Sequence, residues 1–252
     1  SFGSDLSEWD FNSNVDLTDF ISNSGISSFY YEKLLKKLND SQITNKVLGA
    51  HNLKYSSEVD RNELIDEKNW TIIGDEKLSF DPNAFVLEVS IEKDDYSMGI
   101  SGGNEDSFFI DWGDGTSGVS ESGSASHEYT EPGVYFVEII GTFPKLNLGS
   151  NCTVIHNWGN NPWSDMSYMF SYSKFQTIKS NSSPNLSNTT DMSHMFQGAT
   201  SFNGDLSAWD VSNVTNMSGM FSSASSFNGD LSAWDVSNVT NMSGMFNRAS
   251  SF

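Results

Sequence analysis

The stretch SFNGDLSAWDVSNVTNMSGMF occupies residues 201–221 and returns, letter for letter, at residues 226–246, so the chain repeats with a period of 25 residues. A third copy begins at Ser251 and Phe252. Repetition at such a period is typical of a solenoid, because one unit cannot bury its apolar face alone and gains stability by stacking on a neighbour. The repeat therefore predicts a core built from equivalent positions of successive units.

Within each repeat, Leu206–Trp209 is predicted to be a short strand and Met217–Phe221 a helical or 3₁₀ turn. An aromatic and methionine stripe can also line a cofactor site, but its repetition favours a structural core. The predicted core of the repeats consists of Phe202, Leu206, Trp209, Met217, Phe221, Phe227, Leu231, Trp234 and Met242.

The motif MSxMF extends the repeats upstream. It recurs at residues 166–170, 192–196, 217–221 and 242–246. The first two units differ from the consensus elsewhere, as expected of a cap that begins an array.

The chain also opens in the phase of the repeat, with SFGSDLSEWD at residues 1–10. Leu6 and Trp9 match Leu206 and Trp209, and Phe20 matches Phe221 after a deletion of one residue. We therefore expect these 252 residues to be one period of a longer tandem array, or a subunit that docks end to end. The alternative is an array cut arbitrarily at both ends. The predicted assembly interface contains Ser1, Phe2, Leu6, Trp9, Phe246, Ser251 and Phe252.

A helical pattern follows the opening unit. Tyr31, Leu34, Leu35 and Leu38 are spaced as one apolar face of a helix, with Ser27 or Ser28 as its N-cap. A second helix is predicted from Glu58 to Asp66, capped by Ser56 or Ser57. A short strand in residues 69–75 would close this helical cap of the array.

Three alternating or β-branched runs then predict strands at residues 84–92, 108–112 and 135–141. Clusters of Gly and Ser separate them. The pattern favours a β-sandwich of about 65 residues.

The charge of the chain argues against two classes of binding partner. The chain has 33 acidic and 13 basic residues, a net charge of −20, and no Lys or Arg from Ser180 to Asn247. Such a polyanion is a poor ligand for nucleic acid or anionic lipid, because phosphate binding needs Lys and Arg. No apolar run reaches the 18 residues or so of a membrane span. Cys152 has no second cysteine to pair with and is interpreted as a small buried residue.

The candidate metal ligands in the sequence are aspartates at equivalent positions of successive repeats. Asp205 would lie beside Asp230, and Asp210 beside Asp235, where like charges repel unless they are solvated, bonded to backbone N–H groups or bridged by a cation. Calcium prefers such oxygen ligands, so these four residues are calcium candidates, with turn capping as the alternative. We expect no other cofactor.

No catalytic constellation is visible. The four histidines, His51, His127, His156 and His194, form no zinc-binding spacing, and nucleophile-elbow, P-loop and dinucleotide motifs are absent. His194 stands where other repeats have Gly219 and Gly244, so we expect it to be exposed. The chain is predicted not to be an enzyme.

The repeat FNGDLSxWDVSNVTNMSxMF resembles the BspA-like leucine-rich repeat family of bacterial and protist surface proteins. The segments ISSFYYEKLLKKL and LKYSSEVDRNELIDEKNWTIIGD resemble the C-terminal cap of that family. This resemblance implies a cell-surface location and a role in adhesion or matrix.

In the middle of the chain, FFIDWGDGTSG and SHEYTEPGVYFVEIIG resemble a PKD-type immunoglobulin-like domain. The matching motifs lie at residues 112–116 and 127–137. The resemblance implies that Trp112, Asp114 and Tyr135 are structural.

These interpretations combine into a mostly β fold, a leucine-rich-repeat-type solenoid with a helical cap, plus a PKD/Ig-like β-sandwich. The expected domains are a last repeat (1–24), its helical cap (25–80), the sandwich (81–145), and a first cap with the repeats (146–252). The expected function is a non-enzymatic extracellular structural or adhesive surface protein that associates end to end with further copies. The alternative is a surface binding module whose repeat face recognises a host protein or glycan.

Overall fold

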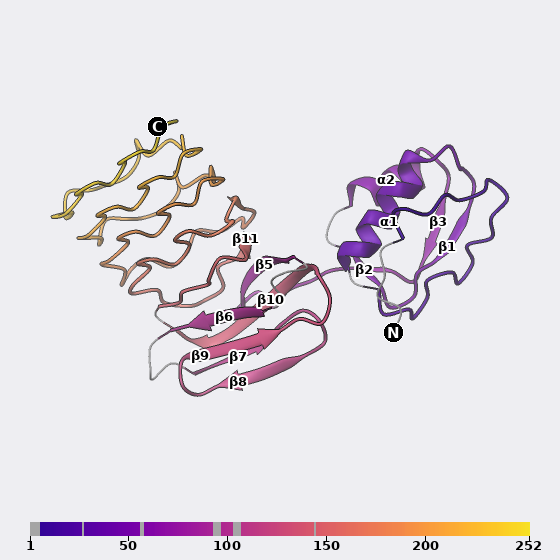
Figure 1. The fold of residues 1–252 in the computed structure, drawn as a ribbon, viewed down its shortest axis with the longest axis horizontal. Coiled ribbons are helices and arrows are strands. Elements are labelled where there is room, and N and C mark those ends of the chain that lie inside the picture. Colours follow the sequence, from indigo (N-terminus) through magenta and orange to yellow (C-terminus); the bar gives the residue numbers. More distant parts are fainter. Residues whose placement is uncertain (1–5, 27, 56–57, 93–96, 103–106, 144) are drawn as a thin grey trace. The chain divides into compact units, whose positions relative to one another are not determined.

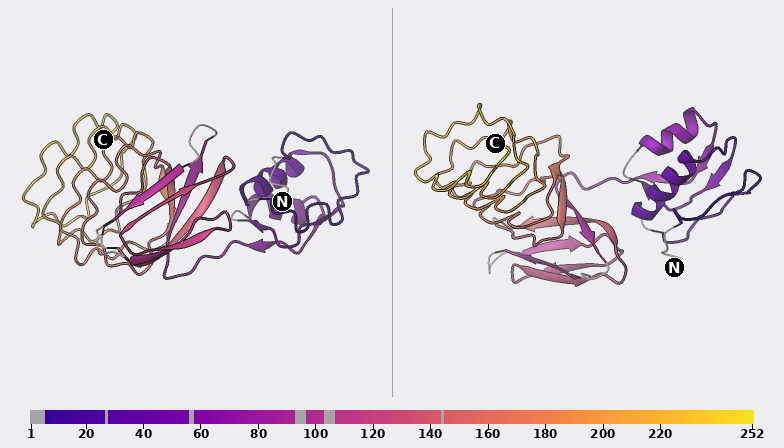
Figure 2. Two further views of the ribbon diagram at one scale, coloured as in Figure 1. Left: turned by 60° about the horizontal axis from the view of Figure 1, so that its bottom comes forward. Right: turned by 45° about the horizontal axis from the view of Figure 1, so that its top comes forward.

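The structure is a computed structural model of the chain, and it describes residues 6–26, 28–55, 58–92, 97–102, 107–143 and 145–252. The chain divides into two compact units, Ser1–Ser79 and Phe80–Phe252. Figure 1 shows the path of each unit, and Figure 2 gives two further views.

The first unit contains two helices, α1 (Ser28–Asp40) and α2 (Val59–Asp66). Both helices were predicted from the sequence; helical periodicity indicated α1, whereas the buried residue of α2 is Leu64. The four residues predicted to form the apolar face of α1 are all buried: Tyr31, Leu34, Leu35 and Leu38. The predicted caps Ser27, Ser56 and Ser57 lie outside the described residues, and α2 has Glu58 at its N-cap position without a side-chain capping bond.

Two pairs of short parallel strands complete this unit. Strand β1 (Val47–Gly49) pairs with β3 (Thr71–Ile73), and β2 (Lys54–Tyr55) pairs with β4 (Glu76–Lys77). Strand β3 is the one predicted within residues 69–75. An isolated parallel bridge between Leu17 and Leu48 adds the opening segment as a further layer.

A buried ion pair crosslinks the first unit. The guanidinium of Arg61, on α2, donates to both carboxylate oxygens of Asp75 at 2.8 and 2.9 Å, and Asp75 has only 1% of its side chain exposed. The Tyr31 hydroxyl donates to the same carboxylate at 2.9 Å, and burial and the Asp75 charge raise the pKa of Tyr31. The Arg61 guanidinium also lies 4.7 Å from the ring centre of Tyr55. Helices α1 and α2 are thus held to the segment that links β3 to β4.

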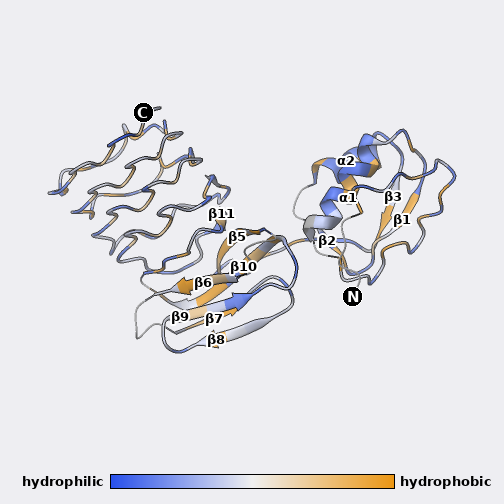
Figure 3. Ribbon diagram, in the orientation of Figure 1, coloured by the Kyte–Doolittle hydropathy of each residue, from blue (hydrophilic) through white to orange (hydrophobic). Residues whose placement is uncertain are grey.

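The second unit begins with a six-stranded sheet in the order β12-β11-β5-β10-β7-β8 and a separate pair, β6-β9. Figure 3 shows apolar residues concentrated on β5 and β10. Side chains of both sheets belong to one apolar core. The strands are β5 (Phe85–Ile91), β6 (Ser97–Ser101), β7 (Ser107–Asp111), β8 (Ser117–Ser120), β9 (Ser124–Glu128), β10 (Gly133–Thr142), β11 (Cys152–Asn157) and β12 (Thr177–Ile178).

Strand β11 joins this sheet to the repeats. It pairs antiparallel with β5 and parallel with β12, so the sheet continues into the first layers of the repeat region. Cys152, at the start of β11, is fully buried, and burial raises the pKa of its thiol. Glu88 of β5 contacts β11 through its carboxylate, which lies 3.0 Å from Nε2 of His156 and accepts a bond from the Thr153 hydroxyl. Burial raises the pKa of Glu88, but the contacts with His156, Lys179 and Thr153 outweigh it and leave that pKa below its usual value.

The predicted fold class, a leucine-rich-repeat-type solenoid with a helical cap and a PKD/Ig-like β-sandwich, is wrong. The chain is rich in β-strands, but its sheets are open, and residues 179–252 contain no strand. The predicted strand at residues 206–209 is a turn, in which the N–H of Trp209 donates to the carbonyl of Leu206 at 3.1 Å. Residues 217–221, which were predicted to form a helical or 3₁₀ turn, form a turn that is not part of a helix.

The composition of the repeat explains this difference. Asn, Asp and Ser side chains bond backbone groups two residues away and so favour turns over a strand ladder. Successive repeats meet instead at isolated parallel bridges, which link Asp165, Asp191, Asn216 and Asn241 in a row.

The ion pair in the first unit allows a direct test of what holds its helices. Asp75→Asn should lower the free energy of unfolding of this unit by about 3–5 kcal/mol, because it leaves the Arg61 guanidinium, whose side chain is only 18% exposed, without a counter-charge. Asp40→Asn is the matched control, since it breaks the exposed Lys36–Asp40 pair and should cost less than about 1 kcal/mol. Urea unfolding followed by the NMR signal of the Trp70 indole, which is buried in this unit, measures both. Equal, small effects would contradict a stabilising role for Arg61.

Candidate functional site

The repeats stack through two columns of phenylalanine rings. In the first column, neighbouring ring centres are 5.5 Å apart with interplanar angles of 3–11°, at Phe170, Phe196, Phe221 and Phe246. In the second column the spacings are 5.1–5.8 Å, at Phe175, Phe202, Phe227 and Phe252. Adjacent columns also touch, at 4.0–4.3 Å within each layer. The 25-residue period therefore places an aromatic pair on an aromatic pair at every layer.

Backbone hydrogen bonds connect the same layers. The N–H groups of Met217, Gly219 and Phe221 donate to carbonyls of residues 241, 243 and 245 at 2.8–2.9 Å. The preceding repeat makes the same bonds to this one, because the N–H of Met192 donates to the carbonyl of Asn216. Figures 1 and 2 show the resulting turns lying side by side in orange to yellow.

Several residues that are buried in repeat 201–225 have more exposed equivalents one repeat later. Met217 is fully buried, whereas its equivalent Met242 is 42% exposed, so Met242 lies outside the core in which it was predicted. Leu231 and Trp234 are only partly buried for the same reason, since residues 226–252 have a neighbouring layer on one side. The other predicted core residues of the repeats are buried: Phe202, Leu206, Trp209, Phe221 and Phe227.

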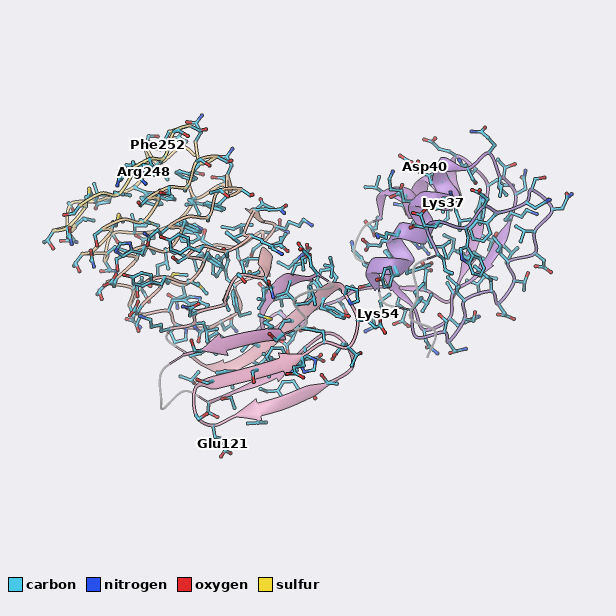
Figure 4. All side chains as sticks on the ribbon, in the orientation of Figure 1. Lys37, Asp40, Lys54, Glu121, Arg248 and Phe252 are labelled. Carbon is cyan, nitrogen blue, oxygen red and sulfur yellow. The ribbon has the colours of Figure 1, made fainter. Side chains whose placement is uncertain are left out.

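The predicted assembly residues fall into three groups. Ser1 and Phe2 lie outside the described residues. Leu6 is buried, while Trp9 is 49% exposed and contacts Phe11 and Phe20. Phe252 is 53% exposed and stacks on Phe246, and Figure 4 labels it on the last layer, near Arg248. Ser251 is exposed.

The opening segment has the backbone of a repeat. Asp19 and Asn23 have left-handed φ values of 56° and 58°, as Gly219 and Ser223 have in the repeat. The N–H of Thr18 bonds the Asp16 carboxylate, just as that of Ser218 bonds the Asn216 side chain. This register equates Ile21, not Phe20, with Phe221, so the predicted match of Phe20 is wrong by one residue.

The four calcium candidates cap turns. Each carboxylate accepts a bond from the N–H two residues on, which joins Asp205 to Ser207 and Asp210 to Ser212, with the same bonds at Asp230 and Asp235. Bonds from the side chain and the N–H of each serine hold the pKa of all four carboxyl groups below the usual value. Within the part of the chain that the structure describes, no group of three or more His, Cys, Asp or Glu residues could hold a metal ion.

Asp114 is a turn residue with a histidine partner. One carboxylate oxygen lies 2.7 Å from Nε2 of His127, and the other accepts bonds from the hydroxyl and N–H of Thr116. Trp112, which is buried, stacks on the His127 ring at 5.1 Å. Burial raises the pKa of Asp114, but the bonds from Thr116 and His127 outweigh it and leave the pKa below 3.8. Tyr135 is buried beside this cluster.

One aromatic surface was missed by the sequence reasoning. Tyr168 and Tyr172 are 45% and 68% exposed, and both adopt left-handed φ values, 60° and 54°. The ring of His194 stacks on that of Tyr168 at 4.7 Å and is partly buried, so the prediction of an exposed His194 is wrong. The signal in the sequence was present, because tyrosine and histidine stand at positions where the later repeats have Gly219, Ser223 and Gly244.

One family model matches the repeat region of the chain. Residues 164–252 match a family model described as Mycoplasma protein of unknown function, DUF285. No curated protein and no solved structure matches the chain. The match covers the stacked layers from Ser164 onward and carries no assigned activity.

Among the residues described here, neither helix has the length and apolarity needed to cross a membrane.

The loss of stability caused by removing a phenylalanine ring should depend on where the ring lies in its column. Phe196→Ala should destabilise the second unit by about 3–5 kcal/mol, because it removes a fully buried ring that contacts both columns. Phe252→Ala, at the exposed end of the second column, should cost much less in dilute solution. Urea unfolding monitored by circular dichroism measures both variants, and equal losses would contradict the columns as the main source of stability.

The Asp114–His127 contact predicts a pH dependence. Because the folded-state pKa of Asp114 lies below its ordinary value, its contribution is present above about pH 4 and is lost as the pH falls through the folded-state pKa. Asp114→Asn should lower the free energy of unfolding by about 1 kcal/mol at pH 7 and by progressively less below pH 4. Glu121→Gln, in the exposed turn labelled in Figure 4, is the control and should show no such convergence. Urea titrations at pH 7 and pH 3 provide the comparison.

Proposed function

We propose that this chain is a non-enzymatic, extracellular structural or adhesive surface protein whose stack of repeats is extended by further units of the same kind, including the opening segment of another copy. One observation carries the proposal. The face that repeat 226–246 turns outward has the same sequence as the face of repeat 201–221 that it covers.

Because repeats 201–221 and 226–246 are identical in sequence, the exposed face of the second can bind another repeat as the first does. Covering repeat 201–221 buries Met217 and Val211, while the equivalent Met242 and Val236 are 42% and 39% exposed. A unit that stacks there would regain the same apolar burial and the same backbone bonds.

The opening segment supplies a complementary unit. Residues 6–24 share the left-handed positions and side-chain capped turns of the repeat, and Trp9 is half exposed although its counterpart Trp209 is buried. The contact is heterologous and does not close, which is the geometry of a fibre.

Stacked acidic residues are compatible with this arrangement. Asp205 already lies beside Asp230, and Asp210 beside Asp235, with each carboxylate exposed and bonded to its own turn. Copies with a net charge of −20 repel one another at long range, so salt should promote their association.

The surface location rests on the resemblance of the repeats to BspA-like surface proteins and of residues 108–141 to PKD-type domains. The same resemblance supports an adhesive or matrix role. The acidic composition argues against nucleic acid as a partner.

End-to-end association can be measured on the chain itself. We expect concentration-dependent rods in sedimentation velocity and electron microscopy, strengthened between 10 and about 150 mM salt as screening increases. Each rod should dissociate under denaturing conditions to chains of 27.8 kDa.

Two variants on opposite faces test the contact. Met242→Lys on the last repeat and Trp9→Lys on the opening segment should each abolish rods, because either places a charge in the buried layer. Val119→Lys, at a residue 67% exposed on β8, is the matched control and should leave the rods intact. Monomers at all concentrations and salt levels, or equal loss in the control, would refute end-to-end stacking.

A further inference from the structure

Two tyrosines occupy positions that disfavour a large side chain. Tyr168 and Tyr172 both lie in the left-handed region, where a side chain crowds the backbone and glycine is preferred. Both are also exposed to solvent, Tyr172 by 68%. Backbone strain combined with exposed aromatic surface is a recognised mark of a functional position.

The fold does not require these rings. The positions equivalent to Tyr168 are His194, Gly219 and Gly244, and those equivalent to Tyr172 are Gly198, Ser223 and Arg248. All eight residues have φ between 54° and 67°, so the same backbone forms with no side chain at all. The tyrosines therefore contribute something other than the turn.

Each tyrosine ring contacts the layer that follows it in the stack. Tyr168 stacks on the His194 ring at an angle of 16°. A Cβ atom added to Gly198 would lie 2.5 Å from Cδ1 of Tyr172, so that ring rests directly on the glycine. Both supports belong to the next layer of the stack. The two exposed side chains, Tyr168 and Tyr172, are together called the aromatic platform.

The surroundings of the platform are polar but electrically balanced. Lys145 is paired with Asp165 at 2.8 Å, and Lys174 with Glu92 at 2.7 Å. The backbone bonds of the two tyrosines join them to uncharged residues: Ser171 donates its N–H to the carbonyl of Tyr168, and the N–H of Tyr172 donates to the carbonyl of Gln197. The chain has a net charge of −20, but paired charges next to the platform neither attract nor repel a charged ligand strongly.

We propose that Tyr168 and Tyr172 form a binding platform for the sugar rings of a neutral glycan. A pyranose presents C–H groups on its faces and hydroxyl groups at its edge, which matches an aromatic face bordered by serine and glutamine. A nucleobase would also stack, but nucleic-acid binding requires a basic groove to hold the phosphates, and both lysines near the platform are paired with carboxylates. This site is independent of the proposed end-to-end contact, since it lies on the first layers of the stack and not on the last repeat.

The repeats themselves supply substitutions that the backbone accepts. Tyr168→Gly copies Gly219, and Tyr172→Ser copies Ser223, so the double variant should be at least as stable as the original chain in thermal unfolding. Tyr168→Phe with Tyr172→Phe keeps both ring faces and serves as the conservative variant. Phe109→Ser, at a ring 42% exposed on β7, removes exposed aromatic surface elsewhere and is the control.

The binding assay uses the full chain, below the concentration at which rods form, on an array of neutral hexose and N-acetylhexosamine oligosaccharides with sialylated and sulfated counterparts. We expect neutral glycans to bind, the Gly/Ser double variant to bind them at least about tenfold more weakly, and the Phe double variant and Phe109→Ser to retain binding. Absence of binding to every neutral glycan, binding restricted to the anionic ones, or binding unchanged in the Gly/Ser variant would each overturn the proposal.

Discussion

Face-to-face contact between phenylalanine rings is the interaction on which the repeat region depends. A layer of 25 residues made of turns contains almost no regular hydrogen bonding of its own. Its stability comes from burying aromatic surface against the layers above and below, and each ring of the two columns lies within 5.8 Å of its neighbours along the column. Because residues 226–246 repeat residues 201–221 letter for letter, the two layers offer the same residues for this contact.

The polar residues of the repeat serve this stacking. Asx turns at Asp205, Asp210 and Asn216 satisfy backbone groups within a layer, which leaves other N–H groups to bond the next layer. Left-handed positions at Gly219 and Ser223 turn the chain back on itself. An acidic repeat is tolerated because its carboxylates lie at the solvent edge, where each is bonded to its own turn.

The two units use different means of stabilisation. The first is held by an apolar face of α1 and by the buried Arg61–Asp75 pair, and both come from side chains far apart in the chain. The second is held by a sheet that passes into the stack through β11. The opening segment nevertheless repeats the left-handed positions and a capped turn of the stack inside the first unit.

The sequence by itself determined the period, helix α1, the three principal strands and most of the buried positions of the repeats, because these follow from the local spacing of apolar residues. Only the tertiary structure decided that Leu206–Trp209 is a turn and not a strand, since the competition between side-chain bonds and ladder bonds depends on the neighbouring layer. The pairing of β11 with β5 joins residues about 65 positions apart, so no local pattern could reveal it. The platform at Tyr168 and Tyr172 was likewise hidden, because a tyrosine becomes informative only once its left-handed backbone and its exposure are known.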